Sequence, residues 1–268
     1  MDFLSFTITI LNNEGIPELG EILISEYSRY FLFLITYNFI GYNTENKAHQ
    51  IEEEAEMIVV KDTVDFYWDP VWPWCWITSR WMIDVGRQKD IHVKWKLFSL
   101  KLINKGREVK EDFRILHEIG LKALRVAAAV RCEFGNDGVG RIYTGLGARY
   151  HHDQEDIDER STIEEILQTC GFPTRLAEAS EDEIWDKDIA AEMDHAIAKA
   201  GTDVGVPLIV LDGGKGAGFF GPVMSPAPTG KDAVKFWDAI IAVGGTPGFF
   251  ELKRTREIGP MFGQHPKI

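Results

Sequence analysis

Between residues 58 and 100 the chain reads as a strand, a helix and a second strand, and this order constrains the fold more than any other feature. The runs at 58–60 and 64–67 are rich in β-branched and aromatic residues, and the strand pattern ends near Trp68. Apolar residues at helical spacing (Trp76, Ile77, Trp81 and Val85) predict a helix from about Pro73 to Gln88. Apolar side chains alternate with lysines at His92–Leu100, which predicts the second strand. This β-α-β order is typical of an α/β fold.

The junction between the first strand and the helix contains Trp72-Pro73-Trp74-Cys75, which has the spacing of a Cys-x-x-Cys redox pair with tryptophan at the first position. A helix N-terminus favours an anion, so a thiol there ionises, with its pKa falling from about 8.5 to roughly 3.5–7. The Trp72 indole cannot ionise or attack, and Cys75 keeps the only sulfur of the motif. A tryptophan-rich buried junction without a redox role is the alternative. Asp69-Pro70 before the motif and the proline within it favour a redox scaffold.

The bulk properties place the chain among globular proteins. It has 268 residues, of which 45% are hydrophobic and 26% are charged. The formal net charge of -13 argues against a nucleic-acid surface and against binding to an anionic membrane. The apolar run at residues 30–42 is shorter than the roughly 20 residues needed to cross a bilayer. Three widely separated cysteines, and no recognisable secretory signal, lead us to expect a cytoplasmic protein.

Residues 1–56 differ from the rest, with no clean hydrophobic period and an acidic patch at residues 52–56. We interpret this extension as the product of a misplaced start codon upstream of Met57. An added domain or docking segment is the alternative. We assign no function to it.

Residues 106–200 are helical in pattern and are interpreted as one insertion between the second strand and the final part of the fold. A turn is expected at Asn136-Asp137-Gly138, and a short helix at residues 141–150. Ser161-x-x-Glu164 predicts a capping box at the start of the next helix. A further helix is expected at residues 182–200, ending before Gly201.

The final part of the fold begins with a buried-strand pattern at residues 205–212. Val206-Pro207 opens it, and we favour a cis peptide bond there over a trans proline at a strand edge. A glycine-rich turn at 213–216, a strand near residues 218–220 and a helix at about 231–242 are expected to follow. The Gly-x-Gly-x-x-Gly match at 216–221 is interpreted as a hairpin, because no helix follows it directly.

Other candidate sites have simpler explanations. His151 and His152 are adjacent on one element and point apart, so a shared metal is not expected and a solvated helix end is the default. His195 is expected to be structural or exposed. Cys132 and Cys170 are expected to be inert thiols, buried or half-buried on helices. We find no metal framework in the sequence.

The motif and its surroundings resemble the DsbA-like, mycothiol-dependent oxidoreductases, a group that includes mycothiol-dependent nitroreductase. The resemblance rests on residues 69–81, 99–104, 204–207, 219–223 and 249–256, and spans roughly residues 57–256. It implies a thioredoxin-like core formed by residues 57–105 and 201–256, the helical insertion at 106–200 and a tail at 257–268. It also implies a cytoplasmic protein with mycothiol as cosubstrate and no tightly bound cofactor, and it leaves a homodimer open.

The same resemblance implies roles for particular residues. Cys75 matches the resolving position, Trp72 replaces the nucleophile, and Pro207, after Val206, matches the cis-proline. Trp74 and Asn104 stand where the family lines its thiol pocket.

Two functions are consistent with the sequence. The first is a thiol-dependent oxidoreductase acting on a small-molecule or disulfide substrate, in which Cys75, with or without bound mycothiol, carries out reduced or single-cysteine chemistry. The second is a redox-inactive binding module, in which the same groove holds a peptide or an aromatic small molecule.

Overall fold

The computed structural model describes residues 4–11, 17–24 and 63–267, and the chain divides into two units, residues 1–59 and 60–268. In the first unit, β1 (Leu4–Leu11) and β2 (Pro17–Ile24) form an antiparallel pair with Leu4 opposite Ile24. The strand predicted at residues 58–60 and the apolar run at 30–42 lie outside the described residues.

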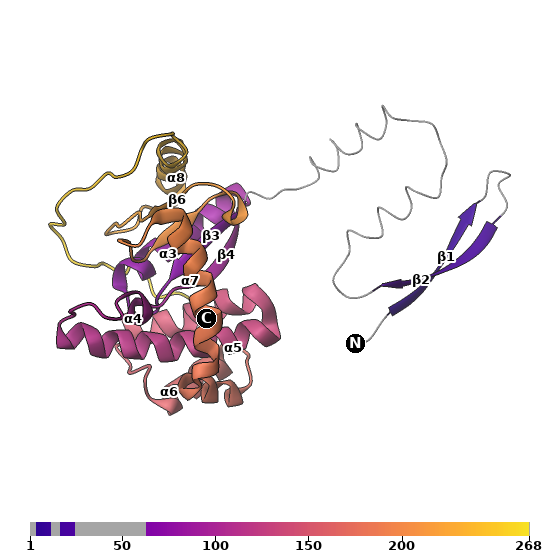
Figure 1. The fold of residues 1–268 in the computed structure, drawn as a ribbon, viewed down its shortest axis with the longest axis horizontal. Helices are drawn as coiled ribbons and strands as arrows, with labels where there is room; N and C mark the ends of the chain where they lie inside the picture. Colours follow the sequence, from indigo (N-terminus) through magenta and orange to yellow (C-terminus); the bar gives the residue numbers. More distant parts are fainter. Residues whose placement is uncertain (1–3, 12–16, 25–62, 268) are drawn as a thin grey trace. The chain divides into compact units, whose positions relative to one another are not determined.

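The second unit is built on a four-stranded sheet in the order β4-β3-β5-β6, of which β3, β4 and β6 are labelled in Figure 1. The central strand β3 (Thr63–Trp68) pairs in parallel with β4 (His92–Leu97) and antiparallel with β5 (Leu208–Val210), which in turn pairs antiparallel with β6 (Gly218–Phe220). Every residue of β3 after the first is buried, as expected for a central strand covered on both faces.

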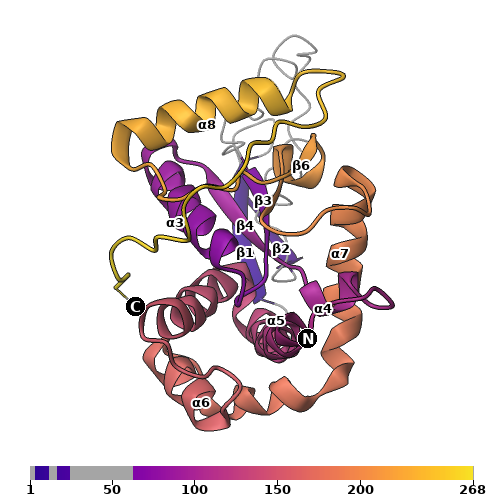
Figure 2. The same ribbon diagram turned by 90° about the vertical axis from the view of Figure 1, so that its left-hand side faces the viewer.

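Helix α3 (Pro73–Lys89) connects the two parallel strands, as the sequence predicts. Pro73 occupies the first helical turn, where a missing N–H costs nothing, and the helix ends at Asp90 in the left-handed conformation. All four apolar residues predicted to share a face are buried (Trp76, Ile77, Trp81 and Val85). The Trp81 indole donates to the Ala233 carbonyl of α8 (Gly230–Gly244), so α3 and α8 pack together (Figure 2).

A helical block connects β4 to β5. Its elements are α4 (Leu100–Ile103), α5 (Glu111–Gly147), the π-helical turn η1 (Ala148–His152), α6 (Arg160–Thr169), the 3₁₀ segments η2 (Thr174–Glu181) and η3 (Glu183–Trp185), and α7 (Asp186–Ala200). Arg125 on α5 makes a two-pronged ion pair with Asp186 at the start of α7, with N–O distances of 2.7 and 2.9 Å. A buried guanidinium satisfied in this way ties the two helices together.

The helix is interrupted close to the turn predicted at residues 136–138. Gly135 has non-helical angles, with φ of 68° and ψ of -168°, so α5 consists of two helical stretches on either side of it. The helix predicted at residues 141–150 is present, but it begins directly after Gly135 and runs to Gly147, where η1 follows. The Asn136 side chain binds the backbone of Trp95 in β4, accepting from its N–H at 2.9 Å and donating to its carbonyl at 2.8 Å, and so holds the start of the second stretch against the sheet.

Three predicted boundaries also need correction. The Ser161 capping box does not form, because Glu159 is the N-cap and makes no side-chain cap bond. The second strand ends at Leu97 rather than at residue 100, because Ser99 caps α4 by accepting from Leu102 N. The helix predicted from residue 182 begins at Asp186, after η3.

The final part of the fold is a hairpin followed by a helix. β5 and β6 are joined through η4 (Asp212–Gly214), where Gly213 adopts a φ of 60°, and α8 follows. The hairpin interpretation of residues 216–221 is thus confirmed. A β-α-β unit followed by β-β-α on one mixed sheet is the thioredoxin-like topology, with the helical block inserted between its halves.

Candidate functional site

Trp72 occupies the N-cap of α3, with extended backbone angles and no side-chain cap bond. Its carbonyl accepts from the N–H groups of Cys75 and Trp76 at 3.0 and 3.1 Å. The half-buried indole packs against Phe113 of α5, with ring centroids 6.3 Å apart. The position at which a helix N-terminus would stabilise a thiolate therefore holds an aromatic side chain that cannot ionise.

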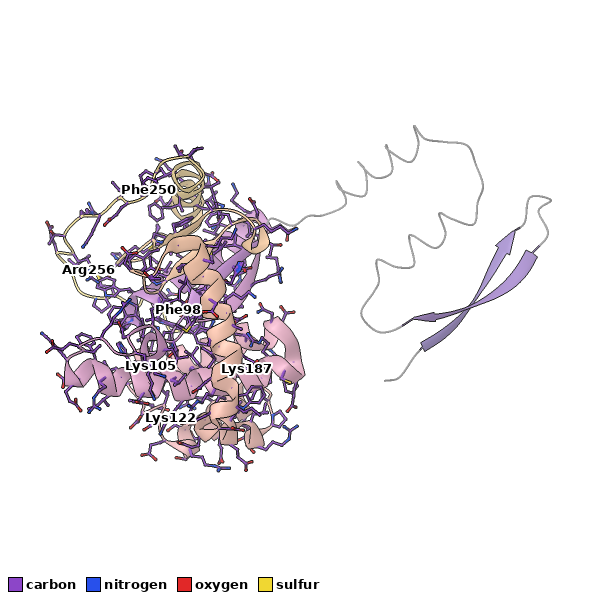
Figure 3. All side chains as sticks on the ribbon, viewed as in Figure 1. Phe98, Lys105, Lys122, Lys187, Phe250 and Arg256 are labelled. Carbon is purple, nitrogen blue, oxygen red and sulfur yellow. The ribbon has the colours of Figure 1, made fainter. Side chains whose placement is uncertain are left out.

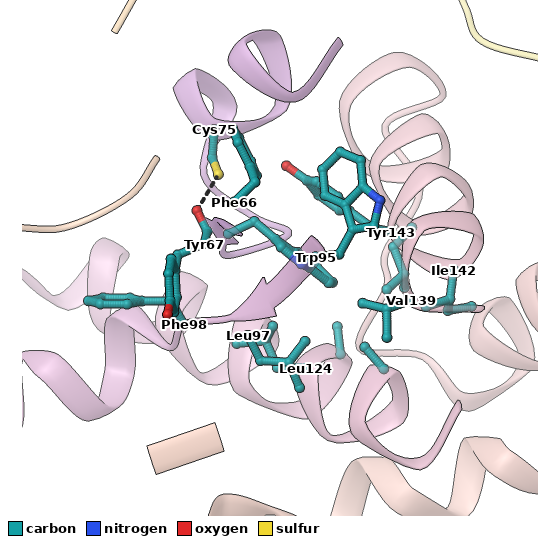
Figure 4. Packing of buried hydrophobic residues seen from close by; sticks show 14 of the residues in the cluster. Phe66, Tyr67, Cys75, Trp95, Leu97, Phe98, Leu124, Val139, Ile142 and Tyr143 are labelled. Atoms are coloured by element: carbon teal, nitrogen blue, oxygen red, sulfur yellow. Dashed lines mark hydrogen bonds between the residues drawn. The ribbon is translucent and has the colours of Figure 1, made fainter. Parts of the chain in front are cut away.

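The Cys75 thiol points into the core and is fully buried. Its Sγ donates to the carbonyl oxygen of Tyr67 in β3 at 3.7 Å (Figure 4). Burial raises the pKa of Cys75 from 9.0 to about 12, an effect that the nearby Asp69 N–H and the Arg80 cation offset only in part. Cys75 is therefore a protonated thiol at neutral pH.

The thiol reaches the strand beside the Val206-Pro207 segment. Tyr67, which accepts its hydrogen bond, pairs across the sheet with Leu208, the residue after Pro207. The Val206–Pro207 peptide bond is cis, both residues are buried, and the Pro207 carbonyl accepts from Gly221 N at 2.7 Å. Cys75 of α3 is thus hydrogen-bonded to β3, and β3 pairs with β5, the strand that begins directly after Pro207.

Trp74 and Asn104 lie on different elements. Trp74 is half-buried in the first turn of α3, and the guanidinium of Arg256 lies over its ring at 5.0 Å from the centroid. Asn104 is the C-cap of α4, and its side-chain amide donates to the Leu100 carbonyl at 2.9 Å. In the described part of the chain, no hydrogen bond joins Asn104 to the Trp72–Cys75 segment.

Asp69 is a site residue that the sequence analysis noted without giving it a role. Its fully buried carboxyl group accepts from Val71 N at 3.2 Å and from Leu100 N at 2.9 Å. It thereby holds the loop before the motif against the start of α4. Burial raises the pKa of Asp69 to about 7, although the two backbone N–H groups oppose this shift. An acidic residue directly after a buried strand, followed by proline, was the available sequence signal.

The adjacent histidines are not a solvated helix end, so that expectation is wrong. His151 is buried, and its Nε2 lies 2.8 Å from the Pro70 carbonyl oxygen in the loop before the motif. Burial lowers the pKa of His151 to about 4, so the ring is neutral and donates to this carbonyl. His152 accepts from the Trp76 indole N–H at 3.2 Å. Both histidines thus connect η1 to residues 69–76, which we call the redox-motif segment.

Trp76 is enclosed between several polar and aromatic groups. The Arg80 guanidinium lies 3.9 Å from its ring centroid, and the Tyr143 ring meets it edge-on at 5.8 Å. The Arg80 Nη2 and the Tyr143 hydroxyl are buried and have no hydrogen-bond partner among the described residues. The Trp76 indole is therefore held between the Arg80 cation of its own helix and the Tyr143 ring of α5.

The other two thiols lie in the helical block. Cys170 is buried, and burial raises its pKa to about 11. Cys132 on α5 is exposed, which corrects the expectation of a buried or half-buried thiol. Its neighbour Glu133 pairs with Arg175, so this stretch of α5 is a solvent-facing surface.

Two further properties of the described residues bear on function. No group of three or more His, Cys, Asp or Glu side chains there is arranged to hold a metal ion. No helix in the described ranges is long and apolar enough to cross a membrane.

The sheet topology and the motif at the start of α3 define a thioredoxin-like protein of the DsbA-like class. The family model described as mycothiol-dependent nitroreductase Rv2466c matches residues 71–254, more than half of the chain. The chain therefore belongs to this Rv2466c-like family, and its general class of function is that of a thiol-dependent oxidoreductase. The resemblance inferred from the sequence is confirmed.

The individual proteins that resemble this chain share less than 30% sequence identity with it. An uncharacterized protein of Mycobacterium tuberculosis, Rv2286c, is 29% identical over 195 residues, which cover 72% of this chain and 82% of that protein. The probable DsbA oxidoreductase SCO1869 of Streptomyces coelicolor is 16% identical with a TM-score of 0.48, over 74% of this chain and 97% of that one. The cytosolic disulfide reductase DsbM of Pseudomonas aeruginosa, solved with GSH, is 14% identical with a TM-score of 0.46, over 67% and 99%.

Proposed function

We propose that the protein is a thiol-dependent reductase in which mycothiol supplies the reducing thiol, and in which the motif residues bind rather than exchange. The observation that carries this proposal is the state of Cys75, which is buried, protonated and hydrogen-bonded to Tyr67. Thiol exchange requires a thiolate, and Trp72 cannot supply one either. A thiol-dependent reaction at this site therefore draws its thiolate from the cosubstrate.

The proposed chemistry balances without a protein thiol. Two mycothiol molecules form one S–S bond and release two electrons and two protons. The substrate takes up both, so that a disulfide becomes two thiols, or an aromatic nitro group becomes a nitroso group with loss of water. The reaction needs a reduced thiol pool, which a cytoplasm maintains.

In this proposal the polypeptide positions the thiol and the substrate. The positive end of the α3 dipole would favour the thiolate form of a bound cosubstrate near Trp72. Trp74 and Asn104 would line the thiol pocket, and the Val206-Pro207 segment would flank it. Bringing two reactants into one geometry is a source of rate enhancement that needs no nucleophile on the protein.

A redox-inactive binding module is the second candidate, and the same observation favours it. A scaffold whose one remaining motif thiol is protonated at neutral pH can hold a peptide or an aromatic small molecule in its groove without turnover. The two candidates differ in whether mycothiol is oxidised at the site.

The test measures mycothiol binding by calorimetry, and mycothiol oxidation coupled to reduction of a disulfide or a nitroaromatic compound. We expect wild type, Cys75→Ser and Cys132→Ser to show equal turnover, because no protein thiol takes part. Loss of turnover in Cys75→Ser alone, in a variant that still folds and binds mycothiol, would show that Cys75 reacts and overturn the proposal. If all three proteins bind mycothiol saturably and none of them oxidises it, the result would favour the binding module over the reductase.

A further inference from the structure

A hollow of about 330 Å³ lies beside the redox-motif segment and is lined by Tyr150, His151, Gln154, Glu155 and Phe262. Four of these residues come from η1 and the turn after it, and Phe262 comes from the C-terminal segment. The volume is at the lower end of the range for small-molecule sites, roughly 300–1,000 Å³. The reaction proposed above assigns no role to this hollow.

Two half-buried aromatic rings form its walls. Phe262 packs on the histidines of η1, with ring centroids 5.1 Å from His151 and 5.7 Å from His152. Tyr150 lies edge-on to His151, with centroids 4.9 Å apart. Rings held in this way offer a flat apolar face to a ligand, and Tyr150 also offers a hydroxyl group at its tip.

The polar groups of the hollow are available to a ligand. Gln154 has a positive φ of 58°, which is uncommon for a residue other than glycine and is often found at ligand sites. In the described part of the chain, neither its amide nor the Tyr150 hydroxyl makes a hydrogen bond. Glu155 Oε1 accepts from Arg149 at 2.5 Å, so the carboxylate is neutralised while its second oxygen remains unused.

We propose that this hollow binds a hydroxylated ring, a sugar or a cyclitol. The C–H face of such a ring can stack on Tyr150 or Phe262, and its hydroxyl groups can pair with the amide, phenol and carboxylate oxygens. A fully apolar ligand would use only the aromatic walls, and an anion would find no cationic side chain in the lining, since His151 is neutral. An uncharged ligand rich in both donors and acceptors fits the lining.

The hollow is connected to the redox-motif segment at two points. His151, in its wall, donates to the Pro70 carbonyl, two residues before Trp72. The C-terminal segment that supplies Phe262 also carries Arg256, which is labelled in Figure 3, and the guanidinium of Arg256 lies over the Trp74 ring. The assignment to a cosubstrate rests on the proposed function: mycothiol carries a glucosamine and an inositol on its cysteine, and the hollow would hold that part of the molecule.

Calorimetry on the full chain tests this inference with two ligands, mycothiol and the thiol-free N-acetyl-glucosaminyl-inositol, whose sugar nitrogen is an uncharged amide as in mycothiol. We expect both to bind and to compete. Gln154→Ala should weaken both about 3- to 10-fold, as expected for one lost hydrogen bond, and Phe262→Ala by a similar or larger factor. Gln154→Gly removes the amide while relieving the positive φ, so a loss of affinity there cannot be attributed to strain. Gln168→Ala and Phe250→Ala, at exposed positions on α6 and on the same C-terminal segment, should leave both affinities unchanged.

The possible outcomes separate the two proposals. If mycothiol binds with an affinity that none of the hollow variants alters, the sugar subsite is overturned and the proposed function stands. If the thiol-free fragment binds and the variants weaken it, but mycothiol is never oxidised, the subsite stands and the reductase is overturned. If neither ligand binds to wild type, both are overturned.

Discussion

The Trp76 ring lies so close to Gly147 that a β-carbon on Gly147 would fall 2.2 Å from the ring atoms Cε3 and Cζ3. Gly147 has ordinary helical angles, so its backbone does not require glycine. Glycine is needed there because the indole of α3 occupies the space beside the end of α5. This contact fixes how closely the helical block approaches the helix that carries the redox-motif segment.

Gly147→Ala should therefore destabilise the protein by about 1–3 kcal/mol, because an added methyl in a packed core forces shifts of side chains or backbone. Urea unfolding followed by tryptophan fluorescence measures the change. Gly259→Ala is the matched control, since a β-carbon there meets no atom within 4 Å, and we expect a change below about 0.5 kcal/mol. Equal unfolding midpoints for the two variants would contradict the packing described.

The three cysteines should differ in reactivity in the native protein. Iodoacetamide near pH 8 should modify exposed Cys132 and spare Cys75 and Cys170, because burial raises the pKa of both and shields them. Peptide mass spectrometry reports the site of modification, and repetition in denaturant should label all three. Labelling of native Cys75 as fast as Cys132 would show that the thiol is not held as described.

Trp72→Cys should create a reactive thiol at the N-cap of α3. The helix N-terminus should lower the pKa of the new thiol below the usual value of about 8.5, which the pH dependence of alkylation measures. We also expect a disulfide to Cys75 after oxidation, and a gain of mycothiol-dependent reductase activity above wild type. Trp72→Ser is the control, since it removes the indole without adding sulfur. Equal activity in the two variants would show that the attacking sulfur adds nothing to this site.

Two buried groups should give opposite pH dependences of stability. The folded Asp69 has a pKa of about 7 and an ordinary value of 3.8, so between these values the folded state keeps a proton that the unfolded state loses, and stability falls as pH rises. The folded His151 has a pKa of about 4 and an ordinary value of 6.5, so between them the unfolded state holds the extra proton, and stability rises with pH. Between pH 4 and 6.5 the two effects offset each other.

Removing either group should leave the pH dependence of stability that the other group causes. Asp69→Asn should make the free energy of unfolding rise with pH relative to wild type across pH 4.5–6.5, and His151→Gln should make it fall. The change in slope is on the order of 1.4 kcal/mol per pH unit for each. Urea titrations at several pH values measure it. Parallel pH profiles for wild type and both variants would mean that neither group titrates as its burial implies.

The sequence predicted the parts of the fold that depend on local periodicity. The start of α3, its buried face and the β5–β6 hairpin follow from residues close in the chain, and so does the placement of Trp72 and Cys75 on α3. Asn136 shows where this reasoning is incomplete: the helix is interrupted next to it, at Gly135, as the turn signal indicates, but the contact of its side chain with Trp95, 41 residues away, could not be predicted.

The surroundings of the site could not be predicted for the same reason. His151 meets Pro70 over 81 residues, and His152 meets Trp76 over 76 residues. A pair of adjacent histidines carries no signal of such partners. A buried contact between distant segments depends on how the helical block packs on the sheet, and local patterns do not encode it.

The indole at the N-cap of α3 also has a genetic consequence. Tryptophan has a single codon, TGG, and a change of its third base to T or C specifies cysteine. Because Cys75, the buried aspartate of the preceding loop and the neighbouring proline segment are all in place, one nucleotide substitution would supply the missing sulfur to a scaffold already built around it. A single base change therefore separates this sequence from one that carries both thiols of the motif.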